Sequence, residues 1–277
     1  WAVYDLFLGL SPDRTRREHI LFMDVDDSAV AQIGVWPWPR AVLGAPFAIH
    51  YVNLVVFDEL EKIGIPVITL NNNNYQDRYC SVLTDDVQGA YEGTRHLLSL
   101  GHQHFAYAEY ERSLFGSVVR DRFFGFKFAL DEAGIDFRSD QRITVELRDQ
   151  SGLERRVAQI FGKPDRPTAL FVHDDYFSAI LHKVLTQRGL RIPADLSMIC
   201  PGDVLDYSEP FFPKLSTMQI DLPLMISLSW DLLLSRLVDE SARVKVLKTR
   251  MHLVDRGSCA SPGGESRLLQ DQEQQPS

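Results

Sequence analysis

The sequence of 277 residues has little cysteine and no excess of basic charge. Its three cysteines, Cys80, Cys200 and Cys259, lie far apart and form neither a Cys-x-x-Cys pair nor a Cys/His cluster, which argues against a disulfide-stapled fold and a zinc site. We expect reduced, buried thiols. Lys and Arg total 29 against 38 for Asp and Glu, a formal net charge of −9. Modules that grip duplex DNA present a basic surface, so this balance argues against binding nucleic acid by charge alone.

Long hydrophobic runs are also missing. The longest stretch without Asp, Glu, Lys or Arg, residues 41–57, contains Pro46, His50 and Asn53. It is shorter than the roughly 20 apolar residues that a membrane-spanning helix needs. The first ten residues lack a basic segment, so no signal peptide is visible. We therefore expect no membrane segment and a cytoplasmic location.

What the chain does contain is a regular alternation of short apolar runs with amphipathic stretches. Hydrophobic residues make up 45% and charged residues 24%, an ordinary globular composition. The apolar runs cover 54–57, 66–70, 104–108, 143–147, 168–172 and 196–200, and the helical candidates cover 88–100, 121–133, 153–161 and 176–189. This alternation predicts an α/β fold with a parallel, doubly wound sheet. The Gly-, Ser- and Gln-rich tail, 261–277, is predicted to be disordered.

Several short motifs follow one another in a fixed order from about residue 81 to 258. They are Asp85-Asp86-x-x-Gly89-Ala90 with His96-Leu97-x-x-x-Gly101-His102, Arg122-x-x-Gly125-Phe126, Pro167-Thr168-Ala169 leading into Asp174-Asp175, the segment from Gly189 to Ser197, and the segments 213–218 and 253–258. In this order they resemble the effector-binding domain of the LacI/GalR transcriptional regulators, a likeness that covers about residues 52–260.

The resemblance implies a type I periplasmic-binding-protein-like fold, with two α/β lobes and a ligand cleft between them. It places 58–84 and 217–240 in a shortened N-terminal lobe, and 85–216 and 241–260 in the C-terminal lobe. It further implies a sensor that binds a small molecule, a sugar or polyol, without a cofactor. A homodimer is a further expectation from the family. DNA would be contacted only through a helix-turn-helix that we do not find in this sequence.

The first 57 residues have a different pattern. Asp24-Val25-Asp26-Asp27-Ser28, the segment 34–40 and the segment 55–58 resemble the opening of CHASE-type extracellular sensor domains of the second class. These residues either complete the first lobe or are a fragment of another domain. This leaves open an alternative function, the extracellular or periplasmic sensor module of a membrane receptor.

Arg122 is the first candidate for contact with a ligand. The resemblance places it at the family's sugar-contacting arginine, and its planar fork suits vicinal hydroxyls or a carboxylate. The alternative is a surface arginine that pairs with Asp121 or Glu132.

Two aspartates at predicted helix starts have two interpretations each. Asp174 lies where the family commonly has a ligand-contacting Asn, but it also precedes a helix and could cap it. An ionised carboxylate accepts hydrogen bonds and does not donate them, which favours a polyol over an anionic ligand. Asp85, at the family's Asp-Asn turn, either contacts ligand or caps the helix from Asp86.

Three further residues complete the candidate site. Asp203 aligns with the second acid of a family Gly-Tyr-Asp-Asp turn, in which the first acid is Gly202 here. Tyr176 and Phe124 either stack on a sugar face or pack in the core.

A metal-assisted hydrolase is the third function considered. The acidic strand ends His173-Asp174-Asp175 and 24–27 could hold Mg²⁺ or perform acid/base chemistry. No Gly-x-Ser-x-Gly elbow, glycine-rich phosphate loop or zinc-ligand spacing accompanies them. We therefore expect neither an enzyme nor a metal site.

Overall fold

The chain separates into two compact units, each made of two stretches of sequence. Unit 1 comprises Trp1–Thr84 and Asp221–Thr249, and unit 2 comprises Asp85–Ile220 and Arg250–Ser277. The computed structural model describes residues 21–23, 47–49, 57, 62, 66–71, 76–111, 116–146, 149–202, 205, 207–210, 212–239 and 243–263. The CHASE-like segments at 24–28, 34–40 and 55–56, and the tail from 264, lie outside these residues.

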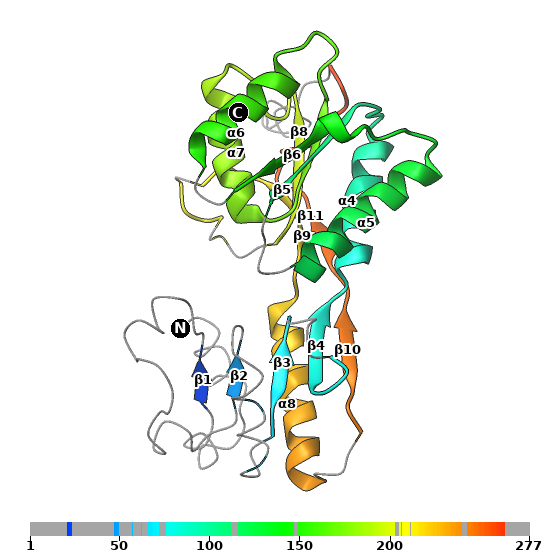
Figure 1. Ribbon diagram of the computed structural model, residues 1–277, viewed down its shortest axis with the longest axis vertical. Helices are drawn as coiled ribbons and strands as arrows, with labels where there is room; N and C mark the ends of the chain where they lie inside the picture. Colours follow the sequence, from blue (N-terminus) through cyan, green and yellow to red (C-terminus); the bar gives the residue numbers. More distant parts are fainter. Residues whose placement is uncertain are drawn as a thin grey trace, which may run out of the picture. The chain divides into compact units, whose positions relative to one another are not determined.

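The described residues of unit 1 include two small parallel sheets and the long helix α8. β1 (Leu21–Met23) pairs with β2 (Phe47–Ile49). The second sheet has the order β10-β4-β3, with bounds Val246–Thr249, Cys80–Thr84 and Ile68–Leu70. Helix α8 (Leu222–Val238) packs against all three of these strands (Figure 1).

Strand β10 of this sheet does not lie where the lobe boundaries suggested by the sequence place it. Those boundaries place 241–260 in the C-terminal lobe, whereas β10 belongs to unit 1. The reason is its parallel pairing with β4, in which Val246 lies opposite Ser81 and Thr249 opposite Thr84. Only the stretch from Arg250 onward returns to unit 2.

Unit 2 is built on a six-stranded sheet of order β11-β9-β8-β7-β5-β6. All neighbouring strands are parallel except β11 and β9, which are antiparallel. The strands are β5 (Phe105–Tyr110), β6 (Arg142–Val145), β7 (Ala169–Val172), β8 (Ser197–Gly202), β9 (Ser216–Gln219) and β11 (His252–Val254).

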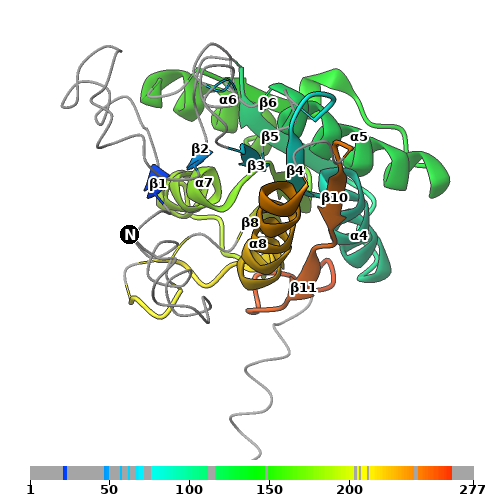
Figure 2. The same cartoon turned by 90° about the horizontal axis from the view of Figure 1, so that it is seen from below.

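Helices cover both faces of this sheet, so the doubly wound α/β prediction is confirmed. The helices are α4 (Asp86–Ser99), α5 (Gly116–Glu132), α6 (Gln150–Phe161) and α7 (Asp175–Gln187). α4 and α5 lie on one side of β5, β6 and β8, and α6 and α7 lie on the other (Figure 1, Figure 2).

The period of two along β5 shows why both faces need a helical cover. Ala106 and Ala108 are buried in the cluster that α6 and α7 complete. Phe105 and Tyr107 point to the opposite side and join the cluster with Phe126 of α5. Alternate residues of a strand face opposite sides of a sheet, so a strand that is apolar throughout is buried on both.

The strand order creates a switch point between β5 and β7. The chain leaves β5 for α5 on one face, whereas it leaves β7 for α7 on the other face. In open α/β sheets, ligands bind outside the carboxyl ends of the strands at such a point. The residues that follow β5 and β7 are therefore the first place to look for a site.

None of the helices in the described part of the chain combines the length and hydropathy that crossing a bilayer requires.

Candidate functional site

Arg122 is a buried residue of α5 whose guanidinium joins three elements. Its Nε donates to Oδ1 of Asp86 at 2.7 Å, and its Nη1 donates to the carbonyl oxygen of His173 at 2.5 Å. Only 7% of the Arg122 side chain and 1% of the Asp86 side chain are exposed. The arginine therefore holds the start of α4 and the end of β7 against α5.

The surface pairing considered for Arg122 is wrong. Asp121 binds its neighbour Arg120 at 3.0 Å, and Glu132 accepts a hydrogen bond from Tyr91. The partner of Arg122 is Asp86, which is 36 residues away in sequence. The Asp86 carboxylate raises the pKa of the guanidinium against the opposing effect of burial, so the pair is a salt bridge.

His173 follows β7 and is buried beside the arginine. Its backbone N–H donates to the carbonyl of Ala108 at 2.9 Å, which continues the β5–β7 ladder by one residue. Its ring Nε2 lies 3.0 Å from Oδ2 of Asp174. Burial, with a smaller contribution from the Arg122 charge, lowers the pKa of His173 to about 3, so the ring is neutral at neutral pH.

Asp174 and Asp85 both cap helices. Oδ1 of Asp174 accepts from the backbone N–H of Phe177 at 2.6 Å, and Oδ1 of Asp85 accepts from that of Gln88 at 3.2 Å. The Asp174 side chain keeps 29% exposure, and burial raises its pKa against the lowering effect of the Phe177 bond. The capping interpretation therefore holds for both residues, while ligand contact stays a prediction.

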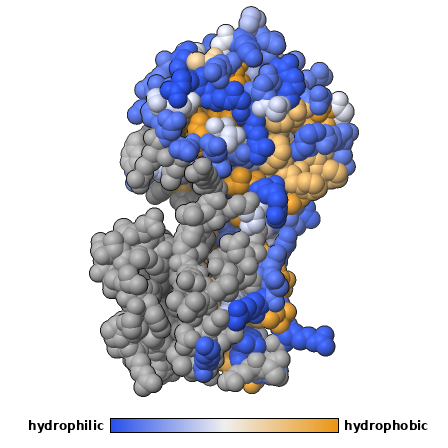
Figure 3. All heavy atoms as spheres, in the orientation of Figure 1, coloured by the Kyte–Doolittle hydropathy of each residue, from blue (hydrophilic) through white to orange (hydrophobic). Residues whose placement is uncertain are grey.

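Tyr176 and Phe124 do not pack in the core. Tyr176 is 60% exposed on the first turn of α7, beside the Asp174 end of the cluster. Phe124 is 59% exposed and stacks on Phe128 at 6.1 Å between ring centroids. Figure 3 shows hydrophobic side chains at the surface on the side where α5 lies. Phe124 is thus placed with Phe128, and the structure does not bring it to the Arg122 cluster.

Asp203 lies outside the described residues, but its neighbour Gly202 is informative. Gly202 ends β8 with φ of 153°, and a Cβ at this position would meet Cγ of Asp175 at 2.6 Å. Asp175 is buried, and its Oδ2 accepts from the backbone N–H of Leu205 at 3.0 Å. Gly202 therefore leaves room for the Asp175 carboxylate.

Tyr110, the last residue of β5, was not expected at the site. Its ring contacts the His173 ring edge-to-face at 5.4 Å and stacks on Phe177 at 4.3 Å. The sequence signal is weak, because the apolar run ends at Ala108 and a tyrosine two residues later is typical of any strand end. His173 was not predicted as a ligand contact either, because a single polar residue after an apolar run is equally common at strand ends.

Metal chemistry finds no support in the described part of the chain. It contains no group of three or more His, Cys, Asp or Glu side chains that could hold an ion. The three cysteines are free, with Cys80 and Cys200 buried and Cys259 half-buried. The acidic segment 24–27 lies outside the described residues.

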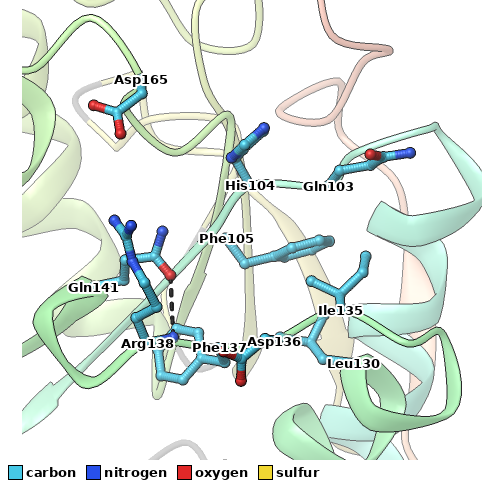
Figure 4. A pocket seen from close by; sticks show the side chains of 10 residues that line it. All are labelled: Gln103, His104, Phe105, Leu130, Ile135, Asp136, Phe137, Arg138, Gln141 and Asp165. Carbon is cyan, nitrogen blue, oxygen red and sulfur yellow. Dashed lines mark hydrogen bonds between the residues drawn. The ribbon is translucent and has the colours of Figure 1, made fainter.

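A cavity of about 380 Å³ lies at the other end of the sheet, where β5 and β6 begin. The Phe105 ring lies among the lining side chains, and a hydrogen bond from Arg138 N to Gln141 Oε1 joins two of the lining residues (Figure 4). A second cavity of about 300 Å³ lies between the end of β6 and α6. Neither is lined by a predicted site residue.

The comparisons with known proteins agree with this fold. The model of the family "Periplasmic binding protein-like domain" matches residues 94–259. The repressor PurR of Photobacterium profundum is 30% identical over 183 residues, which are 64% of this chain and 54% of that protein. The regulator GalR of Escherichia coli is 31% identical over 154 residues, 56% of this chain and 44% of that protein. The chain thus spans about half the length of the curated relatives it matches.

A solved structure extends the match to most of a chain. The LacI family transcriptional regulator from Enterococcus faecium, solved with bound ribose, has a TM-score of 0.64 and 30% identity, with 78% of this chain and 79% of that chain covered. A transcription regulator from Lactobacillus plantarum, 21% identical with a TM-score of 0.66, shares the fold. The relatives named here are transcriptional regulators and not enzymes. This chain belongs to the LacI family and carries its periplasmic-binding-protein-like effector-binding domain.

Proposed function

We propose that the chain is the sensor part of a cytoplasmic transcriptional regulator, and that a sugar or polyol is its effector. The DNA-reading helix-turn-helix would lie outside residues 94–259, the part that matches the family model. The ribose named for the Enterococcus faecium regulator supports the ligand class. A homodimer, as the family resemblance implies, belongs to the same proposal.

The observation that carries the proposal is the buried guanidinium at the switch point of the unit 2 sheet. Asp86 and the His173 carbonyl fix Nε and Nη1 of Arg122, whereas Nη2 has no hydrogen-bond partner among the described residues. A rigid donor with spare N–H groups is well suited to ligand hydroxyls, because its orientation is fixed before the ligand arrives.

The charge around Arg122 favours a neutral ligand. Asp86 balances the arginine charge, and His173 is neutral at pH 7. The exposed edge of the cluster is the Asp174 carboxyl group, which repels an anion when it is ionised. A sugar phosphate would therefore bind less well than the free sugar.

A thermal-shift and calorimetric screen of the full chain with D-ribose, D-glucose, D-galactose and ribitol tests this function. A ligand at 100 times its Kd stabilises the native state by about 2.7 kcal/mol, which is a readily measured shift of the midpoint. We expect at least one of the four to bind saturably. If none of them binds to the folded protein, the proposed ligand class is wrong.

Two matched aspartate variants locate the binding. Asp174→Asn and Asp149→Asn both retain a good helix cap, because Asn caps as well as Asp. Asp149 caps α6 by accepting from the backbone N–H of Gly152 at 2.9 Å, away from Arg122. We expect Asp174→Asn to change the Kd of the bound sugar about tenfold and Asp149→Asn to leave it unchanged. Equal Kd values for both variants would exclude Asp174 from the site.

A further inference from the structure

Two polar side chains that are not among the predicted ligand contacts lie side by side at the switch point. Tyr110 is the last residue of β5, and His173 directly follows β7, the neighbouring strand. Their rings are in edge-to-face contact at 5.4 Å, and both contact Phe177 of α7. They therefore belong to the α7 side of the site, whereas Arg122 comes from α5.

Both residues carry a buried polar atom with no partner among the described residues. These atoms are the phenolic oxygen of Tyr110 and Nδ1 of His173. The His173 side chain is 95% buried, so water does not surround the imidazole. Buried polar atoms nearly always have a hydrogen-bond partner in native proteins, so an orphaned pair in one place needs an explanation.

The protonation states of the two groups are complementary. Nε2 of His173 faces the Asp174 carboxyl group at 3.0 Å, so this nitrogen carries the ring proton and Nδ1 is a bare acceptor. Burial keeps the ring neutral. Burial, with smaller effects of Asp174 and Tyr176, raises the pKa of Tyr110, so its phenol keeps its proton and is a donor. The pair thus offers one acceptor and one donor.

We propose that Tyr110 Oη and His173 Nδ1 form a hydrogen-bonding subsite for one uncharged hydroxyl group of the effector. A hydroxyl group donates to Nδ1 and accepts from the phenol at the same time. A carboxylate or fully ionised phosphate has no proton for Nδ1, and an ammonium group has no lone pair for the phenol. The inference rests on the proposed function, because it assigns specificity within the same site.

Calorimetry with the same four compounds, applied to two variants of His173, distinguishes a role of Nδ1 in binding from a role of Nε2. An Asn side chain places its amide near the position of Nδ1, and a Gln side chain places its amide near that of Nε2. We expect His173→Gln to raise the Kd for D-ribose, or for whichever of the four compounds binds, by tenfold or more, and His173→Asn to raise it less. An equal loss in both variants, or none in either, would overturn the role of Nδ1.

Tyr110→Phe removes the phenolic oxygen without changing the ring. We expect about a tenfold rise in the same Kd, which is the loss of one hydrogen bond. Tyr91→Phe is the matched control, because the half-buried Tyr91 lies on the α4–α5 side and its hydroxyl donates to Glu132. A Kd for Tyr110→Phe equal to that of the wild type would exclude the phenol from the subsite.

The ligand-free protein provides a readout that does not depend on knowing the effector. If only a ligand pairs with these two polar atoms, they are unsatisfied in the free protein, so Tyr110→Phe should keep or raise the Tm of the free protein. A Tm several degrees below wild type would reveal an internal partner and overturn the subsite. If no compound in the panel binds wild type, the sugar class fails, and these melting data still decide the subsite.

Discussion

Arg122→Met should strongly destabilise unit 2, although the substitution replaces a charge by an apolar chain of similar length. The reason is Asp86, whose carboxylate is 1% exposed and would lose the guanidinium that lies 2.7 Å from its Oδ1. Breaking a buried ion pair by removing one partner costs about 3–5 kcal/mol. Removing the other partner, in Asp86→Ala, should cost a similar amount because the buried guanidinium of Arg122 loses its counter-charge.

The double variant Asp86→Ala/Arg122→Met decides whether the pair acts as a unit. With neither charge left, we expect a cost below the sum of the single variants by about 3 kcal/mol. The assay is urea unfolding followed by far-ultraviolet circular dichroism, which reports α4 to α7 of unit 2 together with α8 of unit 1. Arg120→Met is the control, because Arg120 is 74% exposed and its pair with Asp121 should contribute less than about 1 kcal/mol.

Additive effects would refute this reasoning. If the double variant loses as much as both single variants together, Asp86 and Arg122 are not coupled, and the rigid placement of the guanidinium would have to come from elsewhere. A loss in Arg120→Met as large as that in Arg122→Met would show that burial is not the cause.

Four further outcomes follow from the described contacts. Asp174→Ala should cost about 1 kcal/mol in urea unfolding through the lost cap of α7, whereas Asp174→Asn should not; equal losses would contradict capping. His173 has a pKa of about 3 in the folded state, so it does not lower stability above pH 6.5, whereas between pH 6.5 and about 3 the free energy of unfolding falls by up to about 1.4 kcal/mol per pH unit. His173→Asn should flatten that pH profile, and an unchanged slope would place the titration elsewhere. Gly125→Ala should lower the Tm, because its Cβ would lie 2.2 Å from the carbonyl oxygen of Val87 on α4. We expect this overpacking to cost about 1–3 kcal/mol of stability. An unchanged Tm would mean that α4 and α5 move apart without cost. D-ribose 5-phosphate should bind at least tenfold more weakly than D-ribose by calorimetry; tighter binding would mean that the net charge of the site is positive.

Local sequence patterns predicted the framework of unit 2 because its strands are apolar on both faces and its helices are amphipathic. The same logic failed for α8, whose apolar side chains surround the axis and leave no stripe with helical period. It also assigned β10 to the wrong unit, because its pairing with β4 joins residues about 165 positions apart. Nothing within a window of 20 residues specifies such a partner.

In the candidate site, too, local features could be predicted from the sequence and contacts between distant residues could not. The caps at Asp85 and Asp174 follow from a rule that spans three residues, and capping was one of the two interpretations that the sequence allowed. The Arg122–Asp86 pair was missed because the acids considered as partners, Asp121 and Glu132, lie on the same helix, whereas packing of α4 against α5 brings in a distant one. Tyr110 and His173 become informative only through polar atoms that have no hydrogen-bond partner in the described part of the chain, which no sequence shows.

The chain passes between the two units three times, after Thr84, Ile220 and Thr249. During synthesis, β4 therefore has no partner on the β10 side until β10 has left the ribosome, long after β3 and β4 have been synthesised. A fragment that stops at residue 240 would lack β10 of unit 1 and β11 of unit 2, so it would leave both sheets with exposed edges prone to aggregation. Truncated forms of this protein should keep residues up to Ala260, whose carbonyl accepts from the buried Ser197 hydroxyl.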